Sequence, residues 1–221
     1  MGDSSANSEI ELLCIIVNFG IGSKILKVAK QNGLSGGTIF LAKGTVNNHV
    51  LQLLDLADIR KEIVLMIARR ELTDIVLKEL NHKFHFEKPN HGIAFRISVN
   101  NVFGIRSYFN NQLKESRGGQ NSMHNAIFVV VDKGKAENVI EAATLAGSRG
   151  ATVINARGSG IHENAKLFAM LIEPEKEIIM IIAEKKLTET ITTSIRNHLK
   201  IDEPGKGIMF VLGIKEAYGL Y

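Results

Sequence analysis

Short apolar runs recur along the chain between longer polar stretches, and most of them are rich in Val and Ile. Runs of this kind, bounded by Gly or Asp, predict β-strands. The run at residues 178–182 is apolar at every position rather than at alternate positions, so we expect its strand to be covered on both faces. Strands are predicted at residues 12–17, 38–42, 63–68, 93–99, 127–131, 152–156, 178–183 and 208–212.

Helices are predicted in the intervals between several of these strands. Val139 and Ala142 mark the buried side of one helix, because residues three and four apart share a helix face. Gly147 follows that helix at the position where glycine is the favoured C-terminal cap. We expect the second helix of each half to begin near Thr73 or Thr188, since threonine is a good N-cap.

The chain contains two copies of one unit. With a shift of 114 residues, Gly33 falls on Gly147 and Thr38 falls on Thr152. After one inserted residue the shift becomes 115. The later matches are Lys61-Glu62-Ile63 with Lys176-Glu177-Ile178, and Pro89, Gly92 and Phe95 with Pro204, Gly207 and Phe210. Matches spread along the whole unit indicate duplication.

Each copy has the order strand, helix, strand, strand, helix, strand, which is the ferredoxin-like βαββαβ unit. The predicted fold class is therefore α+β, with two tandem units. Helices cover one face of such an antiparallel sheet and leave the other bare, so we expect the sheets to pack face to face in an oligomer. The expected layout is a disordered N-terminus at 1–9, a first domain at 10–105, a linker at 106–125 and a second domain at 126–221.

Composition and charge narrow the classes of function. A chain of 221 residues with 45% hydrophobic and 23% charged residues is typical of a soluble globular protein. Its single Cys, and the lack of an apolar run long enough for a membrane helix, favour a cytoplasmic protein without membrane insertion. The chain has a net charge of +4, and its excess of basic residues lies in the first half, where it is spread rather than clustered. This distribution argues against a nucleic-acid partner.

A glycine-rich stretch follows the first helix of the second copy. Residues 147–160 read Gly-Ser-Arg-Gly-Ala-Thr-Val-Ile-Asn-Ala-Arg-Gly-Ser-Gly, and a turn at residues 205–207 reads Gly-Lys-Gly. Adjacent glycines expose backbone N–H groups to phosphate oxygens, and Arg157 and Lys206 supply positive charge. The alternative is that these glycines only form tight turns.

The second copy resembles the nitrogen regulatory protein P-II family over nearly its full length. The resemblance rests on residues 150–160, on Pro174 and on residues 205–211. It implies a trimeric signalling protein that binds ATP or ADP between subunits and contacts a regulated protein through a long loop, here residues 161–173. A homo-oligomer follows, with a trimer favoured. The nucleotide-binding residues that the resemblance implies are Thr152, Arg157, Gly158, Gly160, His162, Gly205, Lys206 and Gly207.

Both copies depart from the family pattern. Ile208 stands where the family has a lysine, and His162 where it has a glutamine. In the first copy, Val46 replaces the second glycine of the motif, and the turn at residues 88–92 lacks its first glycine. We therefore expect the first copy to be structural or to bind something else.

The resulting prediction is a non-enzymatic P-II-like regulator, with nitrogen metabolism suggested by the family alone. One alternative is a trimeric scaffold or metal-binding protein of the copper-tolerance-like fold, without nucleotide binding. The other is a small enzyme using cleft residues Arg157, His162 and Lys206. We identify no catalytic residues, and the spacing of His82, His85 and His91 matches no standard metal site.

Overall fold

The computed structural model describes residues 9–45, 58–104, 123–160, 166–167, 170–171 and 173–214. The first half of the chain forms one βαββαβ unit, with the antiparallel strand order β4-β1-β3-β2. Its elements are β1 (Ile10–Asn18), α1 (Gly22–Gln31), β2 (Gly37–Thr45), β3 (Asp58–Arg69), α3 (Arg70–Phe84) and β4 (Ile93–Ser98).

The second half repeats this unit, with the strand order β7-β10-β6-β11. Its elements are β6 (His124–Asp132), α4 (Ala136–Leu145), β7 (Thr152–Ser159), β10 (Glu175–Glu184), α5 (Lys185–Leu199) and β11 (Ile208–Ile214). A short ribbon of β8 (Lys166–Leu167) and β9 (Met170–Leu171) lies between β7 and β10 in the chain. The predicted fold class, two tandem ferredoxin-like units, is therefore confirmed.

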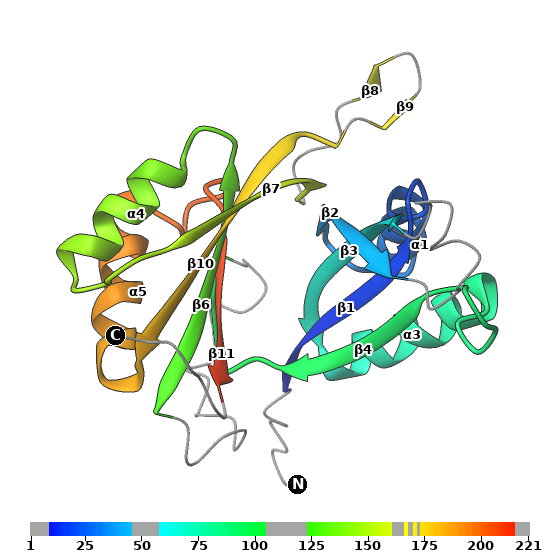
Figure 1. Ribbon diagram of the computed structural model, residues 1–221, viewed down its shortest axis with the longest axis horizontal. Helices are drawn as coiled ribbons and strands as arrows, with labels where there is room; N and C mark the ends of the chain where they lie inside the picture. Colours follow the sequence, from blue (N-terminus) through cyan, green and yellow to red (C-terminus); the bar gives the residue numbers. More distant parts are fainter. Residues whose placement is uncertain are drawn as a thin grey trace, which may run out of the picture.

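The helices lie on the outer sides of the two units, and the sheets face each other between them (Figure 1). Each unit has a core between its helices and its sheet, with Val64 and Leu80 buried in the first and Val129 and Ile191 in the second. A third core lies between the units, where Phe128 and Phe210 stack with ring centroids 5.1 Å apart. The bare sheet faces thus cover each other within one chain, and their packing in an oligomer stays a prediction.

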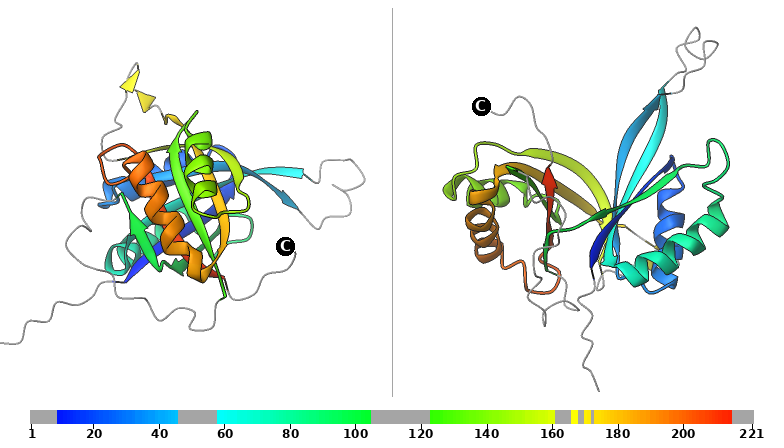
Figure 2. Two further views of the ribbon diagram at one scale, coloured as in Figure 1. Left: turned by 90° about the vertical axis from the view of Figure 1, so that its left-hand side faces the viewer. Right: turned by 90° about the horizontal axis from the view of Figure 1, so that it is seen from below.

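The two sheets are also joined into one by hydrogen bonds. Residues 37–40 of β2 pair with residues 156–159 of β7, edge to edge. After β4 the chain crosses to the second unit, where β5 (Asn101–Phe103) pairs with β11. The result is one sheet of nine strands, in which β4 and β5 stand at opposite ends of the order but follow each other in the chain. Seen from below, this sheet bends into a V between the two pairs of helices (Figure 2).

The second helix of each unit begins earlier than predicted. Helices α3 and α5 follow β3 and β10 with no intervening loop, so the N-cap positions fall on Arg69 and Glu184, which make no side-chain cap hydrogen bond. The predicted N-caps at Thr73 and Thr188 are therefore wrong. Both threonines are buried in the first turn, where their hydroxyls bond to the first strand of the unit and hold the helix against it. The predicted cap at Gly147 is confirmed by its φ of +95°.

One part of the first sheet stays uncovered. On β4, Ile93, Phe95 and Ile97 are 60%, 40% and 37% exposed. Their repeat counterparts on β11 lie in the core between the units, where Phe210 is only 1% exposed. The same surface is therefore buried in one copy and open in the other.

Several expectations fall outside the described residues. These are the N-terminal segment at 1–8, the loop of the first copy at 46–57, most of the expected linker and most of the loop at 161–173. Strand β6 begins at His124, two residues before the expected second domain. Among the described helices, none is both long and apolar enough to cross a membrane.

Candidate functional site

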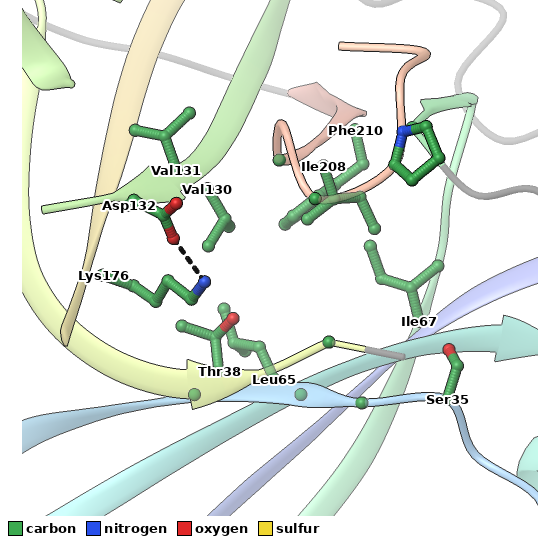
Figure 3. A pocket seen from close by; sticks show the side chains of 18 of the residues that line it. Ser35, Thr38, Leu65, Ile67, Val130, Val131, Asp132, Lys176, Ile208 and Phe210 are labelled. Atoms are coloured by element: carbon green, nitrogen blue, oxygen red, sulfur yellow. Dashed lines mark hydrogen bonds and ion pairs between the residues drawn. The ribbon is translucent and has the colours of Figure 1, made fainter. Parts of the chain in front are cut away.

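A cavity of about 170 Å³ lies between the two units (Figure 3). The first unit supplies Thr38 from β2 and Leu65 and Ile67 from β3. The second unit supplies Ile208 and Phe210 from β11, together with glycines of both predicted motifs. The side chains drawn in Figure 3 meet across this space from opposite units. We refer to this cavity as the inter-unit cleft.

Two of the predicted glycines are required by packing. A Cβ atom on Gly158 would lie 2.3 Å from the carbonyl oxygen of Gly37, across the junction of β7 and β2. A Cβ atom on Gly207 would lie 2.5 Å from the carbonyl oxygen of Val130, and the φ of Gly207 is +133°. These close contacts are a sufficient reason for glycine at both positions, because no larger residue fits there. Ligand binding is not needed to account for them.

The other two predicted glycines face open space. A Cβ atom on Gly160 or Gly205 would meet no atom within 4 Å, and both residues line the inter-unit cleft. Gly205 has a φ of +77°, and its first-copy counterpart Asn90 has a φ of +65°. Asparagine tolerates this left-handed conformation better than other residues with a side chain, so the turn keeps its shape where the first copy lacks the glycine.

The charged side chains in the lining of the inter-unit cleft form a pair. Lys176 Nζ lies 2.5 Å from Asp132 Oδ1, and the Lys176 side chain is 12% exposed. Figure 3 shows this pair at one wall of the cleft, beside Val130 and Val131. The two charges cancel, and the rest of the described lining is apolar or uncharged.

Arg157 is held by two carboxylates. Its Nη2 donates to Glu62 Oε1 of the first unit at 2.8 Å, and its Nε donates to Glu173 Oε2 at 2.8 Å. Ser23 of the first unit donates to the same Glu173 oxygen at 3.0 Å. In sequence, Arg157 precedes the loop at 161–173 and Glu173 is the last residue of that loop. The first unit therefore binds residues at both ends of the loop.

Glu62 is buried and keeps its charge. Burial alone would raise the pKa of this carboxyl, but the hydrogen bond from Arg157, the backbone N–H groups of Gly22 and Gly20 and the charge of Arg157 outweigh it and lower the pKa. The N–H of Gly22 donates to Glu62 Oε2 at 2.6 Å, at the start of α1. One carboxylate therefore caps a helix of its own unit and binds an arginine of the other.

The remaining predicted residues lie elsewhere. Lys206 is exposed and is not among the lining residues of the inter-unit cleft. His162 lies outside the described residues. Thr152 lines a separate surface hollow, together with Gly150, Met180 and Ile182.

The residues that line this hollow in the second unit are the repeat counterparts of residues that line the inter-unit cleft in the first unit. The repeat places Thr38 on Thr152 and Leu65 on Met180, and in the first unit both residues line the inter-unit cleft. Sequence reasoning assigned the site to the second copy and so missed Thr38, Leu65 and Ile67. The repeat alignment was the signal that could have found them.

The histidines of the first unit make other contacts. His85 Nδ1 lies 3.0 Å from Glu87 Oε1, and His91 Nδ1 lies 2.9 Å from the carbonyl oxygen of Phe84. Within the described part of the chain, no three His, Cys, Asp or Glu side chains come close enough to hold a metal ion.

Comparisons with known proteins match the second unit. Residues 124–220 match the family described as Nitrogen regulatory protein P-II. Two solved structures resemble part of the chain at 23% identity: Arabidopsis thaliana PII bound to citrate and the B. subtilis GlnK–ATP complex. Each covers 42% of this chain, with 77% and 82% of its own length and TM-scores of 0.33 and 0.34. No curated protein matches the chain. Both TM-scores are low, so among these comparisons only the family match bears on the second unit.

Proposed function

We propose that this chain, whose residues 124–220 match the P-II family model, is a non-enzymatic cytoplasmic regulator that senses a small ligand. The ligand occupies the inter-unit cleft, and the loop at 161–173 contacts a partner protein. An adenine nucleotide is the candidate ligand and nitrogen metabolism the candidate pathway, both by family resemblance.

The main support for this proposal is that the residues directly preceding the loop in the sequence line the inter-unit cleft. Gly158 and Gly160 line the cleft and lead directly into the loop, and Arg157 and Glu173 tie its two ends together. A ligand against these glycines acts at the base of the loop. It shifts the loop only if it binds one loop arrangement more tightly than another.

Calorimetric titration tests ligand sensing. Adenosine and its mono-, di- and triphosphates are added to the full chain, and hydrogen exchange of residues 161–173 is measured with and without each compound. We expect at least one compound to bind and to change exchange in the loop. If no compound gives heat or a thermal shift at millimolar concentration, ligand sensing at this cleft is ruled out.

A matched pair of variants locates the site. Ile208→Trp fills the inter-unit cleft from β11, so we expect binding to weaken at least about tenfold. Ile75→Trp makes the same change on the outer helix α3, where Ile75 is 58% exposed, and is expected to leave binding unchanged. Equal effects of the two variants would place the ligand elsewhere.

The enzyme alternative has little support from geometry. Arg157 is bound by Glu62 and Glu173, and Lys206 is exposed outside the cleft lining. Within the described residues, the groups nominated for catalysis do not converge on the cavity. We expect no turnover of a bound nucleotide when the products are analysed by chromatography.

Self-association is the second part of the proposal. The apolar face of β4 is the repeat counterpart of the face of β11, which the first unit covers. A further unit would cover the face of β4 in the same way. A second copy of the chain supplies such a unit, and the trimer expected from the sequence is the assembly that we propose. The exposure of Ile93, Phe95 and Ile97 is the observation that supports it.

A further inference from the structure

We infer that the inter-unit cleft selects a flat ligand with little or no negative charge, and that it binds adenosine more tightly than ATP. This inference rests on the proposed ligand sensing at the inter-unit cleft, and it favours an adenine nucleoside over the nucleotide that the family resemblance suggests. It follows from the size, the charge and the backbone hydrogen bonds of the cleft.

The size of the cleft suits a ring system rather than a nucleotide with a phosphate chain. Its volume of about 170 Å³ is below the roughly 300–1,000 Å³ of typical ligand pockets. Leu65, Ile67 and Phe210 present apolar side chains from both units (Figure 3). Apolar walls facing each other across a narrow space favour a flat, weakly polar ligand, because such a ligand loses little hydration on entry.

The cations near the cleft are already bound to carboxylates. Lys176 is the one cationic side chain among the lining residues that the structure describes, and it pairs with Asp132 at 2.5 Å. Arg157 is turned away toward Glu62 and Glu173, at 2.8 Å from each. A triphosphate would have to displace one of these carboxylates or lie beside Asp132, and either arrangement weakens its binding.

Backbone donors near the glycines are also in use. The N–H of Gly158 donates to the carbonyl oxygen of Pro174 at 3.0 Å, and the N–H of Lys206 donates to that of Glu203 at 3.2 Å. A phosphate cradle needs several convergent N–H groups that lack partners inside the protein. At these two positions of the predicted motifs the donors are not available to phosphate.

Affinities of adenosine, AMP and ATP for the full chain test the inference. We expect ATP to bind at least about tenfold more weakly than adenosine, because it brings uncompensated charge beside Asp132. Adenosine affinity should also change little between about 50 and 300 mM salt, since screening acts on charged ligands. Tighter binding of ATP than of adenosine would overturn the inference and leave ligand sensing intact. If none of the three compounds binds, both the inference and the proposed ligand sensing are wrong.

A second test asks whether an added positive charge in the inter-unit cleft raises the affinity for ATP. The Ile208 side chain points into the cleft (Figure 3), so Ile208→Lys adds a cation there, and we expect ATP affinity to rise about tenfold or more. Ile75→Lys adds the same charge on the outer helix α3, where Ile75 is 58% exposed, and should leave ATP affinity unchanged. If Ile208→Lys, shown to be folded by its melting curve, binds ATP no better than the original chain, charge does not limit ATP and the inference is wrong.

Discussion

At the scale of single residues, one buried carboxylate connects the two units. Glu62 caps the start of α1 and binds Arg157 of the other unit. Its repeat counterpart Glu177 caps α4 in the same way, accepting three backbone N–H groups. The sequence repeat placed the two glutamates at equivalent positions. Hydrophobic periodicity says nothing of what a buried carboxylate binds, so neither the caps nor the bond to Arg157 could be predicted.

Removing the charge of Glu62 should destabilise the chain. Glu62→Gln leaves Arg157 with one carboxylate fewer in a partly buried position, so we expect the free energy of unfolding in urea to fall by about 2–4 kcal/mol. Glu177→Gln is the matched control, because within the described part of the chain the hydrogen bonds to Glu177 come from backbone N–H groups, and we expect a loss of about 1 kcal/mol. Equal losses would mean that the bond between the units adds nothing.

The contribution of Glu62 should also depend on pH. The pKa of this carboxyl is lower in the folded chain than its ordinary value, so its stabilisation is fully present above the unfolded pKa of about 4.3 and is lost as the pH falls through the folded pKa. The difference in unfolding free energy between the original chain and Glu62→Gln should be constant from about pH 6 to 8 and shrink below about pH 4. A difference that grows in acid would contradict the assignment.

At the scale of elements, the junction of β2 and β7 makes one sheet out of two. It uses unlike parts of the two copies: residues 37–40 at the start of β2 pair with residues 156–159 at the end of β7. Gly158 permits this approach because its missing side chain would meet the backbone of β2. This glycine of the predicted binding motif therefore serves the junction itself.

A methyl group on Gly158 should separate the strands. We expect Gly158→Ala to lower the free energy of unfolding by about 1–3 kcal/mol, as overpacking against backbone does, and to speed hydrogen exchange in residues 156–159. Gly160→Ala is the control two residues away, since its Cβ atom meets nothing within 4 Å. A stable Gly158→Ala chain with unchanged exchange would show that the strands are not in close contact.

The sequence was sufficient to predict each unit but not how the units join. Apolar periodicity and cap residues such as Gly147 act locally, and they give the order of strands and helices in both copies. The β2–β7 pairing and the three-residue β5 depend on which strand edges meet, and edge hydrogen bonds come from the backbone and leave no side-chain pattern. The site residues of the second copy could be proposed from its motif. Thr38 and Leu65 of the first copy were missed, although the repeat alignment pairs them with Thr152 and Met180.

At the scale of the whole molecule, the contact between the units is head to tail. Because the start of β2 meets the end of β7, the end of β2 and the start of β7 are left without such a partner within the nine-stranded sheet. In a head-to-tail contact the two partners use different surfaces, so each partner keeps one surface free for a further copy, and such contacts build rings or filaments. This geometry supports the proposed self-association.

A charge on β4 should disrupt the assembly. We expect Phe95→Asp to lower the mass measured by light scattering toward the 24.3 kDa of one chain, because a carboxylate does not bury well in an apolar contact. Ile75→Asp is the control, since Ile75 is 58% exposed on the outer helix α3. If the original chain is already monomeric, or if both variants keep its mass, the face of β4 is not the contact.

The crossing of the chain into β5 has a consequence for how the protein tolerates cleavage. Residues 101–103 belong to the first half by sequence but add a strand to the second half, and Val99 and Asn100 bond on either side of the crossing. If the chain is cut between residues 104 and 123, the two fragments should therefore reassociate and co-purify. Fragments divided between residues 98 and 101 would move β5 to the second fragment and should reassociate less well.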